Sequence, residues 1–221
     1  EVHPAEVSSR LDALKSSADL VECEPEVFQQ PLTARAEQVT AQSLGKLLAA
    51  PSCLPPILID KAVDWAQGKA GFGFAPEQAE GLKTALSSKV SILTGGPGTG
   101  KTTILQALVA ILKAKKVRVQ LTAPTGRASR RMAETTSHFS QTVHRLLQFD
   151  PSAGGFTANE NKPLSCDFVV MDEASMLDVR LAAALVRAIP AQAPLLLVGD
   201  ADQLPSVGSG NVPKDLIESG Q

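Results

Sequence analysis

Apolar and polar positions follow one pattern up to about residue 70 and a different pattern after it. In the first part, apolar residues recur mostly at helical spacing. This pattern predicts three helices and one extended segment, over residues 5–16, 32–50, 57–67 and 20–28. A boundary is then marked by three glycines, Gly68, Gly71 and Gly73. We therefore predict a small, mostly helical domain over residues 1–70, in which no residue pattern suggests chemistry.

From Phe74 onward, short apolar runs alternate with segments of helical periodicity. The apolar runs predict four strands, over residues 90–93, 117–123, 168–171 and 195–198. One predicted helix opens at residues 75–78, and others cover residues 102–113, 128–134, 142–148 and 179–189, with a loop over residues 149–162. Strands that alternate with helices form a parallel sheet. We predict an α/β domain over residues 71–221, with ligands at the carboxyl ends of its strands.

The turn after the first of these strands fits the pattern GxxxxGK[ST] at every position. Glycines let the backbone wrap a polyphosphate with successive N–H groups pointing inward, and the following helix adds its partial positive charge. Lys101 can reach the β and γ phosphates, and Thr102 can bind Mg²⁺. A chance glycine-rich turn is the alternative, but the strand and helix lie where the motif needs them. The predicted nucleotide-binding residues are Gly95, Gly96, Pro97, Gly98, Thr99, Gly100, Lys101, Thr102 and Thr103.

The third and fourth predicted strands also end in polar residues. In phosphoryl transfer, one carboxylate holds Mg²⁺ and a neighbour positions the attacking water, roles that suit Asp172 and Glu173. Such a pair alone usually caps a helix, but this one follows a phosphate-binding loop in the same chain. Gln203 can contact the γ phosphate or its water and report hydrolysis to the rest of the molecule. Without the other two motifs, its segment would read as a turn with a capping aspartate.

Composition describes an ordinary globular protein of 221 residues, 43% hydrophobic and 20% charged. The formal net charge of −2 does not indicate a nucleic-acid partner, but the charge distribution does. Residues 1–80 hold twelve acidic and six basic side chains, whereas residues 81–133 hold ten basic and no acidic ones. Such a block suits phosphate partners. For Lys113, Lys115 and Lys116 alone, a solvated helix face explains the charges better.

The three cysteines lie far apart without CxxC spacing, which argues against a disulfide framework or a zinc site and favours a reducing compartment. No apolar run approaches the roughly 18 residues of a membrane span. We therefore expect a cytoplasmic protein with no membrane contact. Because the first residue is Glu1 rather than Met, we also expect a piece of a longer protein.

The motifs together resemble the superfamily 1 DNA helicases of the RecD-like group, the exodeoxyribonuclease V alpha-chain family. The resemblance runs from about Phe74 to the end of the chain, and it rests on residues 95–102, 122–128, 142–147, 172–176 and 199–207. It implies a RecA-like P-loop NTPase domain that uses ATP and Mg²⁺. It further implies catalytic roles for Lys101, Asp172, Glu173 and Gln203, metal binding by Thr102 and Asp172, and recognition of adenine by Gln78.

The same resemblance implies a partner, single-stranded DNA, along which relatives translocate from 5′ to 3′ in recombination or repair. The implied DNA-binding residues are Pro124, Thr125, Gly126, Arg127, Thr142 and His144. For His144, a packed helix residue is an equally good reading. Backbone contacts from such loops are independent of base sequence and sensitive to salt.

One departure from the family is large, because relatives carry a second RecA-like domain whose arginine reaches the γ phosphate, and this chain ends before it. An arginine of this kind is typically worth about 10³–10⁵ in rate. We therefore expect the chain alone to bind nucleotide weakly, hydrolyse it poorly and unwind nothing. The missing domain is an expected partner, and recombination or nuclease subunits are further candidates.

Two other function classes stay open at this point. One is a different P-loop NTPase, such as a signalling GTPase or a kinase, although the guanine-reading pattern NKxD does not occur. The other is a module that binds nucleotide without hydrolysing it and recruits a partner such as a nuclease subunit.

Overall fold

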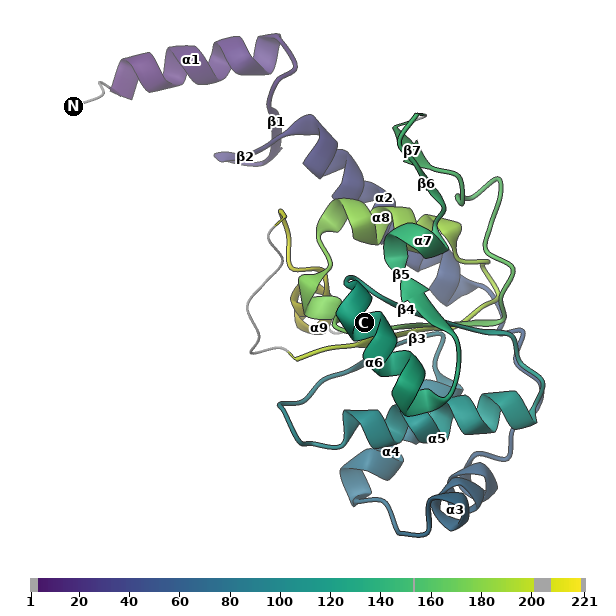
Figure 1. Cartoon of the computed structure of the whole chain (residues 1–221). Helices are drawn as coiled ribbons and strands as arrows, with labels where there is room; N and C mark the ends of the chain where they lie inside the picture. Colours follow the sequence, from purple (N-terminus) through teal and green to yellow (C-terminus); the bar gives the residue numbers. More distant parts are fainter. Residues whose placement is uncertain (1–3, 153, 201–207, 220–221) are drawn as a thin grey trace.

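A parallel sheet of five strands organises the fold (Figure 1). The computed structural model describes residues 4–152, 154–200 and 208–219. The strand order is β3 (Val90–Leu93), β9 (Leu195–Val198), β8 (Phe168–Met171), β4 (Val119–Ala123) and β5 (Ser140–Thr142), and every neighbouring pair is parallel. All residues of the central strands β8 and β9 are buried, as in a sheet covered on both faces.

Helices cover both faces of this sheet (Figure 1). One core holds alternate residues of β8 and β9 together with the helices α3 (Ile59–Ala70), α4 (Pro76–Ser87), α5 (Lys101–Ala114) and α6 (Gly126–Thr136). The other core holds the intervening residues with α2 (Pro31–Ala49), α7 (Val143–Leu146), α8 (Val179–Ala188) and α9 (Val212–Glu218). The predicted α/β fold, a parallel sheet flanked by helices, is confirmed.

Three local predictions need correction. Residues 149–162, predicted as a loop, contain the paired strands β6 (Phe149–Asp150) and β7 (Gly155–Phe156). The edge strand β5 was not predicted, because its sequence Ser-Gln-Thr carries no apolar pattern; its backbone pairs with β4, and Thr122 Oγ1 donates to the Gln141 carbonyl at 2.9 Å. The helix predicted over residues 142–148 is confined to α7, and a short 3-10 helix, η1 (Ala174–Met176), follows β8.

The first part of the chain contains α1 (Pro4–Ser16), which projects from the body, and the hairpin of β1 (Val21–Glu24) and β2 (Val27–Gln29) (Figure 1). The next two helices, α2 and α3, pack instead into the cores beside the sheet. Leu44 and Leu47 of α2 are buried in the same core as α8, and Val63 and Ala66 of α3 are buried with α4 and α5. The division of the chain at residue 70 stays a prediction, and this packing counts against a separate core for α2 and α3.

None of the helices in the described residues is both long and apolar enough to cross a membrane. All three cysteines are free, and burial raises the pKa of the Cys166 thiol to about 12, so this thiol is chemically quiet.

Candidate functional site

The glycine-rich loop connects β3 to α5, as predicted, and its backbone conformation favours glycine. Gly98 and Gly100 have φ angles of 80° and 87°, in the left-handed region that other residues avoid. At Gly100 a side chain would also be obstructed, since an added Cβ would lie 2.0 Å from Nε2 of Gln78. The sequence therefore fixes a tight loop at the start of α5.

Lys101, the first residue of α5, folds back over this loop. Its ammonium donates to the carbonyl oxygen of Gly95 and, at 2.9 Å, to that of Gly96. Thr99 Oγ1 donates to the same Gly96 carbonyl at 2.9 Å. These bonds hold the ammonium beside the N-terminus of α5, where the partial positive charge of the helix already favours an anion.

Asp172 and Glu173 follow directly after β8 and are half-buried. The backbone N–H of Glu173 donates to Asp172 Oδ1 at 2.9 Å. Burial raises the pKa of Asp172, while Arg131 and Lys101 act in the opposite direction. Burial also raises the pKa of Glu173, and the neighbouring Asp172 carboxylate adds to this shift. The two acids thus occupy a region that disfavours their negative charge and favours a bound cation.

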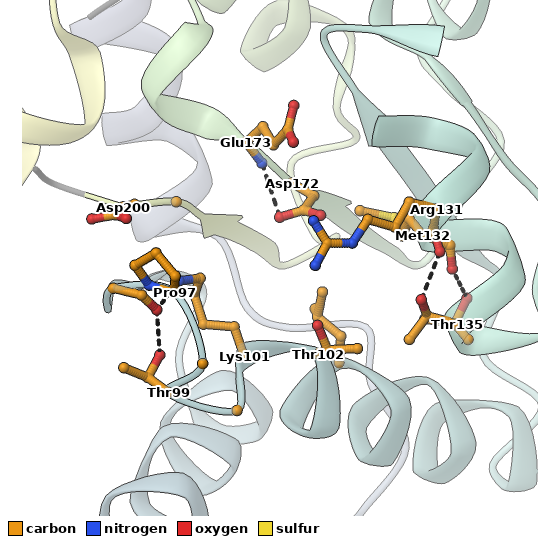
Figure 2. A pocket seen from close by; sticks show the side chains of 16 residues that line it. Pro97, Thr99, Lys101, Thr102, Arg131, Met132, Thr135, Asp172, Glu173 and Asp200 are labelled. Atoms are coloured by element: carbon orange, nitrogen blue, oxygen red, sulfur yellow. Dashed lines mark hydrogen bonds between the residues drawn. The ribbon is translucent and has the colours of Figure 1, made fainter. Parts of the chain in front are cut away.

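The loop and the two acids line one cavity of about 460 Å³ (Figure 2). They meet because β3 and β8 are parallel and separated only by β9, so that their carboxyl ends share one edge of the sheet. Gly199 and Asp200, which follow β9, line the cavity from the same edge. Among the residues predicted to bind nucleotide, the lining includes Gly96, Pro97, Gly98, Thr99, Gly100, Lys101 and Thr102.

A group of α6 residues lines the side of the cavity across from Asp200 (Figure 2). The sequence prediction did not assign a role to these residues: Arg131, Met132, Thr135 and Thr136. The guanidinium of Arg131 points toward Asp172 and Thr102 (Figure 2). A signal was available, since Arg127, Arg131 and Thr135 lie four residues apart and therefore on one face of the helix. The helix that carries this face, α6, follows β4, and the carboxyl end of β4 lies at the same sheet edge as the two acids.

Three of the residues predicted to bind nucleotide, Gln78, Gly95 and Thr103, do not line the cavity. Gln78 of α4 uses its amide inside the protein: Oε1 accepts from the Ala75 N–H at 3.1 Å, and Nε2 donates to the Thr99 carbonyl at 3.2 Å. Gln78 therefore braces the glycine-rich loop, and its predicted contact with adenine stays a prediction. Gly95 and Thr103 are outside the lining residues as well. Gln203 lies outside the described residues, so its predicted position next to the acids is not described either.

The predicted DNA-binding residues gather at the ends of β4 and β5. These strands pair in register, with Ala123 opposite Thr142, so that the starts of α6 and α7, which follow them, are neighbours. Thr125 and Thr142 cap α6 and α7, because each hydroxyl accepts from a backbone N–H three residues later. Pro124 is half-buried beside Thr125, whereas Gly126 and Arg127 are exposed at the start of α6.

His144 is exposed on α7, but its ring packs against two phenylalanine rings of the β6–β7 hairpin. The ring centroids lie 5.9 Å from Phe149 and 5.7 Å from Phe156. These ring contacts support the interpretation of His144 as a packed residue, although the residue as a whole is exposed.

Comparison with known proteins shows a matching family and several similar proteins. The AAA domain family matches residues 78–209. The chain is similar to the ATP-dependent RecD2 DNA helicase of Deinococcus radiodurans, at 41% identity over 81% of this chain and 24% of that protein. It is also similar to the RecBCD enzyme subunit RecD of Mycolicibacterium smegmatis, at 38% identity over 67% of this chain and 31% of that protein.

Among solved structures, the Pif1 helicase of Candida albicans matches with a TM-score of 0.43 and 25% identity, over 61% of this chain and 34% of that one. The chain spans about a quarter to a third of the length of the two curated relatives.

Proposed function

Because the chain belongs to the AAA domain family, with RecD-type helicases among its homologues, we propose that it is the ATP-binding motor domain of an ATP-dependent DNA helicase. The observation that carries the proposal is the cavity in which the glycine-rich loop faces Asp172 and Glu173. The chemistry of ATP hydrolysis needs these two groups of residues on opposite sides of one polyphosphate.

In this proposal, the loop N–H groups and Lys101 bind the phosphates, while Thr102 and Asp172 hold Mg²⁺. The residues present fit the metal, since Asp172 is a half-buried carboxylate whose pKa is raised mainly by burial and which forms no ion pair within the described residues. When bound, Mg²⁺ would supply positive charge beside the β and γ phosphates. Thr102 would contribute its hydroxyl from the opposite wall of the cavity.

Glu173 is the proposed base or water-positioning residue. A raised pKa strengthens a carboxylate as a proton acceptor, and the neighbouring Asp172 contributes to that shift. Glu173 lines the cavity next to Asp172, but its carboxylate points away from the glycine-rich loop (Figure 2), so positioning the attacking water requires this side chain to turn toward the terminal phosphate. Adenine recognition by Gln78 and coupling of the γ phosphate to DNA by Gln203 are finer parts of the same proposal.

Single-stranded DNA is the proposed second substrate. Its support is the cluster of exposed and capping residues after β4 and β5, which borders the basic helix α6. We also propose, from the family resemblance, 5′ to 3′ movement, a second RecA-like domain that completes the site, and recombination or nuclease subunits as partners, since several relatives are named RecBCD enzyme subunits. The chain alone is then expected to unwind nothing. The cytoplasmic location stays a prediction.

Nucleotide binding is the first test, because it needs only the 221-residue chain. A fluorescent, slowly hydrolysed ATP analogue is titrated into wild type, Lys101→Ala and Lys113→Ala in the presence of Mg²⁺. Lys113 lies at the other end of the same helix, which makes it the matched control for loss of a lysine. We expect Lys101→Ala to weaken binding strongly and Lys113→Ala to leave it unchanged. Equal effects of the two variants would remove the proposed nucleotide site.

DNA-stimulated ATP hydrolysis by the full-length gene product is the second test. Stimulation that disappears in Lys101→Ala supports the helicase. Hydrolysis indifferent to DNA would indicate another kind of P-loop NTPase. Nucleotide binding without turnover would indicate a module that recruits a partner.

A further inference from the structure

Arg131 is a third positively charged group at the proposed nucleotide site, beside Lys101 and the N-terminus of α5. It lines the cavity from α6, and its guanidinium points between Thr102 and Asp172 (Figure 2). Its backbone carbonyl accepts from Thr135 Oγ1 at 2.6 Å, which is an ordinary helix contact. The guanidinium itself forms no ion pair within the described residues, although two carboxylates lie near enough to feel its charge.

The position of α6 explains why this side chain reaches the cavity. Thr125 caps the helix directly after β4, so the first turns of α6 rise from the same sheet edge as the acids after β8. Arg130 and Arg131 are both exposed, but Arg131 lies four residues after Arg127, on the face of α6 that turns toward the acids, and of the two only Arg131 lines the cavity. One of two adjacent arginines is thus directed into the site by the helix periodicity alone.

The guanidinium faces one end of the space that a nucleotide would occupy. The glycine-rich loop wraps the inner phosphates, and the acids after a strand lie at the terminal phosphate and its metal. Because Arg131 is directed at the gap between Thr102 and Asp172, it lies at the terminal-phosphate end of the cavity. A guanidinium offers five N–H donors in a planar fork that matches two phosphate oxygens.

We propose that Arg131 binds the terminal phosphate of a nucleoside triphosphate and thereby lets this domain distinguish a triphosphate from a diphosphate. The inference rests on the proposed function, since it needs a nucleotide in the cavity. It differs from the family expectation that a second domain brings the arginine, because here the cation belongs to the same domain as the glycine-rich loop.

A purely electrostatic role is the competing explanation, in which Arg131 only offsets the negative charge of Asp172 and Glu173. In that role, Arg131 would stabilise the charged forms of Asp172 and Glu173 and would give the site no preference for a triphosphate over a diphosphate. Removal of the side chain would then weaken both nucleotides equally. It could also strengthen triphosphate binding, because the acids would be freer to hold Mg²⁺.

The test measures the affinity of the 221-residue chain for two fluorescent nucleotides in Mg²⁺, methylanthraniloyl-labelled AMP-PNP and methylanthraniloyl-labelled ADP. Wild type is compared with Arg131→Ala, Arg131→Lys and the matched control Arg130→Ala, and thermal unfolding checks that each variant is folded. We expect Arg131→Ala to weaken triphosphate binding about ten-fold, or about 1.4 kcal/mol, and diphosphate binding far less. Arg131→Lys should keep part of the preference, and Arg130→Ala all of it.

Two failures can be told apart. If wild type binds neither nucleotide, the proposed function is wrong and the inference falls with it. If wild type binds both, and Arg131→Ala lowers the two affinities equally, leaves them unchanged or strengthens triphosphate binding, only the inference about Arg131 is overturned.

Discussion

Gly98 and Gly100 allow a matched pair of substitutions in the glycine-rich loop. Their φ angles are nearly equal, 80° and 87°, so alanine meets the same backbone strain at both. Their surroundings differ, because an added Cβ at Gly98 meets no atom within 4 Å, whereas one at Gly100 would lie 2.0 Å from Nε2 of Gln78. We predict that Gly100→Ala destabilises the chain more than Gly98→Ala does, and that the difference measures the bonds of Gln78.

The left-handed conformation costs a residue other than glycine about 1–2 kcal/mol, which is the whole expected cost of Gly98→Ala. At Gly100 the new methyl group also displaces the Gln78 amide, which is the flexible end of its side chain and moves away without shifting the backbone. The extra cost is therefore that of two hydrogen bonds, to Thr99 and from Ala75, at about 0.5–1.5 kcal/mol each.

Thermal unfolding of four variants measures this difference: Gly98→Ala, Gly100→Ala, Gln78→Ala and the double variant with alanine at residues 78 and 100. For a chain of this size, 1 kcal/mol shifts the melting temperature by about 2–4 °C, so Gly100→Ala should melt several degrees below Gly98→Ala. Gln78→Ala should lower the stability of wild type but change little in the Gly100→Ala background, where the bonds are already lost.

Equal melting temperatures for the two glycine variants would refute the reasoning, and so would a Gln78→Ala effect of the same size in both backgrounds. Either result would mean that the amide of Gln78 does not brace the loop, which would leave it freer for the predicted contact with adenine.

Three further predictions concern the acids and the core. Asp172→Asn should raise the melting temperature of the ligand-free chain, because the pKa of Asp172 is raised by burial and its charge is costly, while Mg²⁺-dependent nucleotide binding falls; a lower melting temperature would contradict this. Arg118 lowers the pKa of Asp167, so this pair stabilises the fold above the ordinary carboxyl pKa, and the contribution is lost as the pH falls through the lowered value. The difference in melting temperature between wild type and Asp167→Asn should therefore be largest near neutral pH and shrink below about pH 4. A difference that does not change with pH would contradict this prediction. Leu47→Ala should cost about 2–5 kcal/mol and shift a single unfolding transition of the whole chain, since Leu47 is buried in the sheet core; a separate second transition would instead support a distinct domain over residues 1–70.

The elements that sequence patterns predicted well are those with strong local signals. The runs Phe168–Met171 and Leu195–Val198 are apolar throughout, so they were expected as buried strands, and β8 and β9 have those bounds. Pro76 at the first turn of α4 and the glycines before Lys101 gave equally local signals. The strand β5 had none, because an edge strand needs only backbone partners, and its side chains are half-buried polar groups.

By itself, the sequence determined the α/β fold, the glycine-rich loop and the two acids, because periodicity and backbone conformation are encoded within a few neighbouring residues. Only the tertiary structure decided which of these meet. The strand order places β9 between β3 and β8 and so brings Asp172 to Lys101, α6 turns Arg131 into the same cavity, and the loop engages the amide of Gln78. These contacts depend on the packing of segments that are distant along the chain, which no local pattern specifies.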